Sequence, residues 1–173
     1  MHPHADLIDH FYHALARRDA EGMVACYHPE IEFSDPVFPR LKGEQAGGMW
    51  RMLCERGKDL RVEHRDVEAN ETSGRARWEA WYTFSATGRQ VHNIIAAEFL
   101  FRDGKIARHR DSFSFYRWAR QSLGTTGWLL GWSGLLRRKV RGQAARNLES
   151  HLGRSSSSSC PSGAGGKAAH WGP

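Results

Sequence analysis

The stretch Ile31-Glu32-Phe33-Ser34-Asp35-Pro36-Val37 is the part of the sequence that most constrains the fold. From Ile31 to Asp35 it alternates between apolar and polar residues, which is the pattern of a half-buried β-strand. Successive side chains of a strand point to opposite faces, so Asp35 shares the buried face with Ile31 and Phe33. Burial destabilises the charged form of a carboxylate, and the stretch therefore predicts an acid/base group that faces an apolar interior.

Helices and further strands flank this strand. Apolar residues at helical spacing predict helices over residues 5–18, 20–27 and 44–56, although Gly47-Gly48 weakens the last of them. Strands are predicted over residues 60–69, 75–86, 90–102 and 105–118, with a bend into helix near the end of the last one. Early helices followed by a run of strands joined by turns predict an α+β fold, in which a curved antiparallel sheet wraps over three N-terminal helices.

The sequence changes character from about residue 122. A helix predicted over residues 135–152 carries an apolar stripe on one side and basic residues on the other. We interpret it as packing on its own domain or on a second copy. Peripheral contact with a membrane or an acidic partner, suggested by Trp128, Trp132 and the basic side, is the less favoured alternative. The expected organisation is a domain over residues 1–121, a basic helical extension over 122–152, and a disordered Ser/Gly-rich tail over 153–173.

Composition and charge narrow the classes of function. The net charge of +6 comes from the C-terminal part, because residues 117–173 carry nine Lys and Arg against one acid, Glu149. Residues 1–116 carry 16 Lys and Arg against 18 Asp and Glu, which disfavours a nucleic-acid-binding domain. The N-terminus has no signal-peptide pattern, and the three cysteines show no metal-ligand spacing. We therefore expect a cytoplasmic protein with reduced thiols.

With this element order and Asp35-Pro36-Val37 in place, residues 5–118 resemble the NTF2-like superfamily, and within it the SnoaL-like and ketosteroid-isomerase-like branch. The similarity to ketosteroid isomerase runs without gaps over residues 11–35 and returns over residues 88–101. The resemblance implies a cone-shaped fold with an apolar pocket, usually a homodimer, and Asp35 as a general base that moves a proton beside a ketone. The ligand-binding residues implied for the pocket, whose aromatics core packing would explain equally well, are Trp50, Tyr82, Phe84, Asn93, Ile95 and Phe113.

The resemblance fails at the oxyanion hole of the isomerase. Its two hydrogen-bond donors fall on Phe11 and Ala97, and neither residue can donate from its side chain. Losing one such donor typically costs roughly 10²–10³ in rate. Steroid isomerisation by that mechanism is therefore not expected.

The last predicted strand offers other polar groups. His109, Asp111 and Phe113 alternate onto the pocket face. This segment is also similar to the end of limonene-epoxide hydrolases, in which the matching aspartate activates water. That family needs an earlier Arg-x-Asp pair, but Arg77-x-Glu79 is shifted by one residue and would point to the other face.

These observations predict a SnoaL-like protein with an apolar pocket for a small hydrophobic cyclic molecule. If it is an enzyme, it would be a cofactor-independent isomerase, cyclase or hydratase, with Asp35 as base and Asp111 and His109 as second acid/base. The alternative is a non-catalytic ligand-binding or dimerisation module, in which Asp35 makes a turn hydrogen bond and Asp111 pairs with an arginine. No cofactor is implied. His10 and His13 lack a third ligand, so no metal site is expected.

Overall fold

The computed structural model of the chain describes residues 2–157. Its N-terminal elements are α1 (Pro3–Ala16), α2 (Ala20–Ala25), β1 (Tyr27–Ser34), β2 (Leu41–Lys42) and α3 (Glu44–Arg56). Then come β3 (Arg61–Ala69), β4 (Ser73–Phe84), β5 (Arg89–Arg102), β6 (Lys105–Ser112), α4 (Phe115–Leu123), α5 (Thr125–Leu130) and α6 (Gly134–Ser157). The sequence did not indicate the short β2. The last strand, β6, ends at Ser112, which is earlier than expected. The helix expected near its end is the separate helix α4, which Ser114 caps by accepting a hydrogen bond from the backbone of Arg117.

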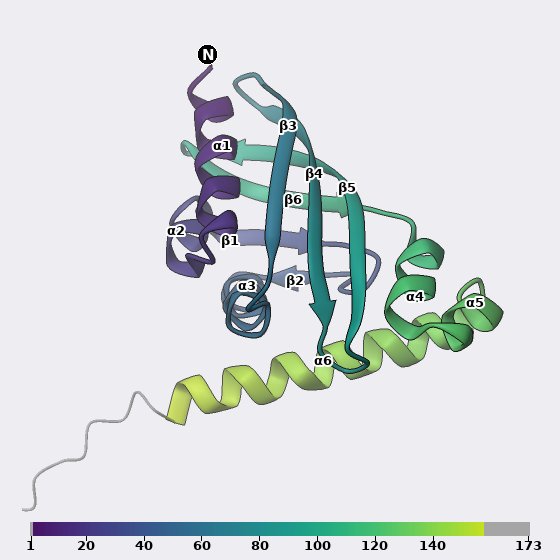
Figure 1. Cartoon of the computed structure of the whole chain (residues 1–173). Helices are drawn as coiled ribbons and strands as arrows, with labels where there is room; N and C mark the ends of the chain where they lie inside the picture. Colours follow the sequence, from purple (N-terminus) through teal and green to yellow (C-terminus); the bar gives the residue numbers. More distant parts are fainter. Residues whose placement is uncertain (1, 158–173) are drawn as a thin grey trace, which may run out of the picture.

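The six strands form one curved sheet in the order β2-β1-β6-β5-β4-β3. Strands β3 to β6 are antiparallel neighbours, as predicted, whereas β1 runs parallel to β6. The parallel register pairs Phe33 with His109 and Ser34 with Arg110, so Asp35 and Asp111 follow directly at the same end of both strands. Figure 1 shows β3 and β4 crossing the direction of β1, β2 and β6, which gives the sheet the cone shape expected for an NTF2-like fold.

The main core lies between the inner face of the sheet and the helices α1 to α3. Helix α1 contributes the fully buried side chains of Ile8, Phe11 and Tyr12, which are met by Phe33 from β1 and Phe99 from β5. These residues follow the helical and strand spacing of the sequence, so the periodic pattern alone accounts for this part of the core.

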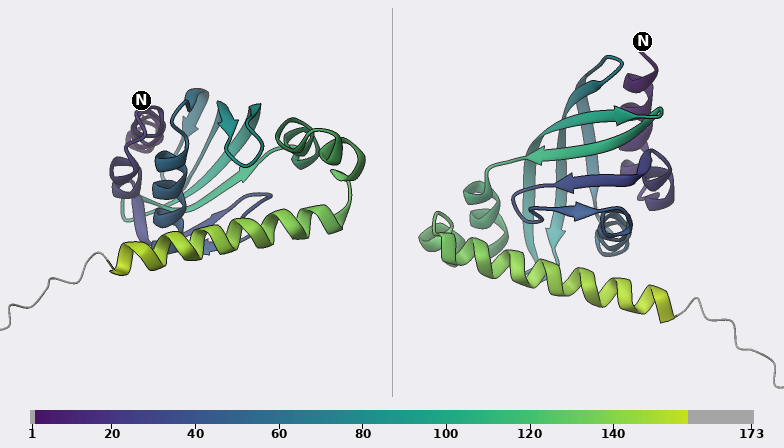
Figure 2. Two further views of the ribbon diagram at one scale, coloured as in Figure 1. Left: turned by 60° about the horizontal axis from the view of Figure 1, so that its bottom comes forward. Right: turned by 180° about the vertical axis from the view of Figure 1, so that it is seen from behind.

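Helix α6 covers the remaining side of the core, as Figure 2 shows. Its apolar stripe packs on its own domain, with Leu148 in the main core cluster and Leu136 in a second cluster beside α4. Gly48 of α3 faces this helix, and a Cβ there would lie 2.4 Å from Cδ2 of Leu152, so a larger residue would require the Leu152 side chain to move. The glycine that weakens α3 in isolation therefore makes room for α6.

Helix α6 also ends later than the sequence indicates. It continues through Ser157, so residues 153–157 are helical and do not belong to a disordered tail. The rest of that expected tail lies outside the described residues. Within residues 2–157, no helix combines the length and the apolar character needed to cross a membrane.

Candidate functional site

A cavity of about 540 Å³ lies between the inner face of the sheet and the helices α3 and α6. This volume is within the usual range for small-molecule sites, which is about 300–1,000 Å³. The structure brings all six residues expected at a pocket into its wall, namely Trp50, Tyr82, Phe84, Asn93, Ile95 and Phe113. Helix α6 adds a wall that sequence reasoning did not anticipate, and its apolar members are Leu136, Val140 and Ala144.

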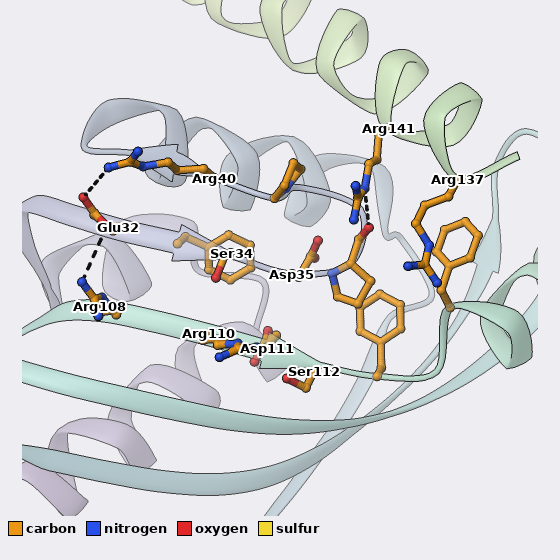
Figure 3. Close-up of a pocket in the computed structure, with 15 residues that line it drawn as sticks. Glu32, Ser34, Asp35, Arg40, Arg108, Arg110, Asp111, Ser112, Arg137 and Arg141 are labelled. Carbon is orange, nitrogen blue, oxygen red and sulfur yellow. Dashed lines mark hydrogen bonds and ion pairs between the residues drawn. The ribbon is translucent and has the colours of Figure 1, made fainter. Parts of the chain in front are cut away.

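A second, more open hollow of about 730 Å³ lies at the ends of β1 and β6 (Figure 3). It shares Phe33, Asp35, Asp111 and Phe113 with the wall of the cavity. The rest of its lining is rich in arginine, with Arg40, Arg108, Arg110, Arg137 and Arg141. The two carboxylates therefore lie between an apolar cavity and a basic hollow.

Asp35 makes a turn hydrogen bond with one carboxylate oxygen and presents the other oxygen to the cavity, so it fits both of the roles expected for it. Its Oδ1 accepts hydrogen bonds from the backbone N–H groups of Val37, at 2.7 Å, and of Phe38. Its Oδ2 accepts none from residues 2–157, and the residue lines both hollows. Burial raises the pKa of the Asp35 carboxyl to about 7, and the negative charge of Asp111 adds to the rise, while the two backbone donors and Arg141 oppose it. Near neutral pH both protonation states of Asp35 are populated, as a general acid/base requires.

Asp111 is held by a chain of buried hydrogen bonds. Nε1 of Trp50 lies 2.7 Å from the Tyr27 hydroxyl, which lies 2.8 Å from Nδ1 of His109, and Nε2 of His109 lies 3.0 Å from Oδ1 of Asp111. The indole N–H of Trp78 donates to the same Oδ1 at 3.3 Å. An indole N–H can only donate, so the Tyr27 proton is left for Nδ1. This order of donors assigns the histidine proton to Nε2, which donates to Asp111.

His109 does not reach the cavity, which corrects its expected role as a direct acid/base. Its side chain is fully buried, both ring nitrogens have partners, and it is absent from the cavity wall. Its link to the cavity wall is the hydrogen bond between its Nε2 and Oδ1 of Asp111, which makes it a candidate positioning residue. Sequence reasoning missed Tyr27 because it placed this residue at the end of the second helix, whereas β1 begins there in the structure. The register of β1 also shifts between Tyr27 and Glu32, so the alternation around Asp35 does not extend to Tyr27.

Two hydrogen-bond donors face the cavity from neighbouring strands. The Tyr82 oxygen accepts from Nε1 of Trp118 at 2.9 Å, and its own proton has no acceptor in the described part of the chain. Asn93 is 9% exposed as a residue, and its side-chain amide makes no hydrogen bond with any described residue. The register of β4 and β5 makes these two residues diagonal neighbours on one face. Burial raises the pKa of Tyr82 to about 12, with a contribution from the nearby charge of Asp35, so the hydroxyl keeps its proton at neutral pH.

The other positions singled out in the sequence do not contribute donors or ligands. Phe11 is buried against Trp50 and His109, and Ala97 lies directly opposite Asp111 in the β5–β6 pair. Glu79 bonds to Arg65 and His92, and neither it nor Arg77 lines the cavity, as the one-residue shift predicts. His10 and His13 are exposed, and residues 2–157 hold no cluster of three or more side chains that could bind a metal.

The family model described as the SnoaL-like domain matches residues 8–109. The protein belongs to the SnoaL-like family. This match confirms the resemblance to the NTF2-like superfamily. The family model ends before α4, so the last three helices of this SnoaL-like protein lie beyond the matched segment. No curated protein sequence matches the chain.

Solved structures share this fold at low sequence identity. IdmH from Streptomyces antibioticus, provisionally assigned as a polyketide cyclase, is 20% identical with a TM-score of 0.59, over 72% of this chain and 100% of its own. A protein from Xanthomonas campestris with the same provisional assignment is 22% identical with a TM-score of 0.58, over 69% and 96% of the two chains. A limonene-epoxide-hydrolase-like epoxide hydrolase from M. tuberculosis is 18% identical with a TM-score of 0.55, over 78% and 95%.

Proposed function

We propose that this SnoaL-like protein binds a small hydrophobic cyclic ketone in the cavity and transfers a proton beside the carbonyl group. The observation that carries the proposal is the meeting of three groups at one apolar cavity. Asp35 has a carboxyl pKa of about 7, and Tyr82 and Asn93 present hydrogen-bond donors that have no acceptor among the described residues. The provisional cyclase assignments of two structural neighbours fit this proposal.

The chemistry follows from the roles of these groups. The ketone oxygen accepts hydrogen bonds from the Tyr82 hydroxyl and the Asn93 amide, and Oδ2 of ionised Asp35 removes a proton from the adjacent carbon. The electron pair of the broken C–H bond moves into the enolate, whose oxygen the two donors stabilise. Asp35 then returns the proton to a second carbon, which completes an isomerisation. In a substrate with a second carbonyl, the enolate instead attacks that carbonyl, which closes a ring and takes up the proton.

Asp111 serves the site as a second carboxylate. Its charge helps to raise the pKa of Asp35, and the chain through His109 and Tyr27 keeps its Oδ1 pointed into the protein. Its Oδ2 accepts no hydrogen bond from the described residues and is available to a ligand or to water. Water addition, with Asp111 or Asp35 as base, is thus a variant of the same acid–base chemistry.

Proton exchange on 2-tetralone in D₂O tests the proposal directly. Wild-type protein is expected to accelerate deuterium incorporation beside the carbonyl, measured by NMR. Asp35→Asn is expected to lose about 10²–10⁴ of that acceleration, the usual share of a general base. Tyr82→Phe is expected to lose roughly 10²–10³, the usual share of an oxyanion donor. The exposed turn residue Glu71 provides a control, since Glu71→Gln should leave the exchange rate unchanged.

Binding is measured in the same samples by quenching of the cavity tryptophans Trp50, Trp78 and Trp118. Quenching without accelerated exchange would overturn the catalytic proposal and favour the alternative, a non-catalytic binding module. That alternative is motivated by the apolar side chains at Phe11 and Ala97. Absence of quenching would contradict the proposed ligand class as well.

A further inference from the structure

The large hydrophobic side chains that are most exposed to solvent gather in one place. Within residues 2–157 the five most exposed belong to α5, the first turn of α6 and the short connection between them, with Trp128 at 59% and both Trp132 and Leu135 at 77%. We call this set the apolar tip, and it consists of Trp128, Leu129, Leu130, Trp132 and Leu135. Single exposed apolar residues are normal on a protein surface, but a cluster that contains two tryptophans indicates an interaction surface.

The packing of the neighbouring residues holds the apolar tip in place. Gly127 is buried against α4, where a Cβ would lie 1.8 Å from the carbonyl oxygen of Ala119, so only glycine allows α5 to pack this closely. Leu136, the residue after Leu135, is buried in the cluster beside α4. The start of α6 therefore has two apolar faces, and only the inward one is covered by the domain. Figures 1 and 2 show α4 and α5 standing out from the end of the sheet, and no other helix or strand of residues 2–157 lies over them on the outward side.

Basic residues surround the apolar tip on both sides. Arg117 and Arg120 are exposed on α4, and Arg138, three residues after Leu135, is exposed on the same side of α6. Between residues 117 and 157 the only acid is Glu149, near the far end of α6. Tryptophans and leucines bordered by arginine and lysine match the boundary between the acyl chains and the anionic headgroups of a bilayer. A second copy of this chain is a poorer fit, because joining two tips would bring their basic borders together.

We propose that the apolar tip docks this protein on the surface of an anionic lipid bilayer. The sequence favoured packing of the extension on its own domain over membrane contact. The structure separates these roles, because the stripe of α6 packs on the domain while the apolar tip stays exposed. Leu123, Thr126 and Leu136, next to the apolar tip, also line the cavity. The docked protein would thus present one end of its cavity to the bilayer, and this last step alone rests on the proposed function.

Vesicle co-sedimentation tests the docking without reference to catalysis. Wild-type protein is expected to sediment with vesicles of phosphatidylcholine mixed with phosphatidylglycerol, and much less with phosphatidylcholine alone. Trp128→Ser combined with Trp132→Ser should weaken binding at least about tenfold, because the inserted apolar surface is lost. Arg120→Gln combined with Arg138→Gln should weaken it about tenfold or more and reduce its dependence on salt. Leu100→Ser, at an exposed leucine on β5, is the matched control and should bind like wild type.

Two sedimentation results would overturn the proposal. Equal sedimentation of wild type and the double tryptophan variant would do so, provided circular dichroism shows that both are folded. Failure of wild type to sediment with the anionic vesicles would do so as well. Light scattering on the same proteins tests the alternative in which a second copy of the chain covers the apolar tip. A dimer that the double tryptophan variant lacks would assign the apolar tip to contact between copies.

Discussion

At the scale of the residue, the ionisation of Asp35 links stability to pH. Burial raises the pKa of its carboxyl to about 7 in the folded protein, against about 3.9 in an unfolded chain. Between these values the folded state binds more protons, so the free energy of unfolding falls as the pH rises from about 4 to about 7. Asp35→Asn does not titrate and keeps an oxygen for the N–H groups of Val37 and Phe38. We expect the variant to match wild type near pH 4 and to be more stable near pH 8, by about 4 kcal/mol.

Urea denaturation at several pH values measures this difference. The control is Glu71→Gln, because Glu71 is exposed in the turn before β4 and should show no such pH-dependent gain. If Asp35→Asn raised the free energy of unfolding by the same amount at every pH, titration of the Asp35 carboxyl would not be the cause of the stabilisation.

Two buried tyrosines offer a second comparison of single residues. The Tyr27 hydroxyl joins Trp50 to His109, whereas the Tyr12 hydroxyl is buried without a hydrogen-bond partner in the described part of the chain. Tyr27→Phe would leave two buried polar groups unpaired and should lower the free energy of unfolding by about 1–3 kcal/mol. Tyr12→Phe removes an unpaired polar group and should leave stability unchanged or raise it by about 1 kcal/mol. Equal losses in urea denaturation would show that the chain to Asp111 adds nothing beyond burial.

The sequence predicted which face of the sheet each of the candidate acid/base side chains occupies, but not how deeply each side chain is buried. Alternation placed Asp35, His109 and Asp111 on the inner face, where the structure has them. Alternation does not say how deep a side chain lies, and His109 proved to lie behind Asp111. The partners of this chain, Trp50 and Trp78, come from α3 and β4, so their contacts depend on long-range packing that no local pattern records.

At the scale of the element, α6 carries its two environments within one helix. Leu148 is 4% exposed and belongs to the main core, whereas Leu135 lies on the apolar tip. Leu148→Ala should lower the free energy of unfolding by about 2–5 kcal/mol, the usual cost of truncating a buried leucine. Leu135→Ala should change it by less than about 0.5 kcal/mol. Both values come from urea denaturation, and similar values for the two variants would contradict the packing of α6 on the domain.

Most element types were predictable because each has a local signal. Helical spacing gave α1, α3 and α6, and the Asp103-Gly104 turn gave the β5–β6 hairpin. The parallel pairing of β1 with β6 joins segments far apart in the chain, and only the register of the finished sheet reveals it. The role of Gly48 could not be predicted either, because it depends on the contact with Leu152 of α6, which is distant in the chain.

At the scale of the whole molecule, the cavity is shared by two parts of the chain that the sequence had separated. The family model stops at residue 109, yet α6 forms one wall of the cavity opposite the sheet. The extension is therefore part of the candidate site and not an appendage to it. The homodimer implied by the resemblance stays a prediction, and the light scattering that accompanies the vesicle experiment measures it.

Neighbouring alanines of α6 test whether the ligand lies in this shared cavity. Ala144 lines the cavity, and Ala145 is exposed about 100° further around the helix. A phenylalanine at either position changes the helix in the same way, but only at Ala144 does the new ring occupy ligand space. We expect Ala144→Phe to weaken quenching of the cavity tryptophans by 2-tetralone at least about tenfold, a loss of about 1.4 kcal/mol in binding free energy. Ala145→Phe should leave it unchanged. If both variants bind like wild type, the ligand lies in the basic hollow beside Asp35 and not in the cavity that α6 completes.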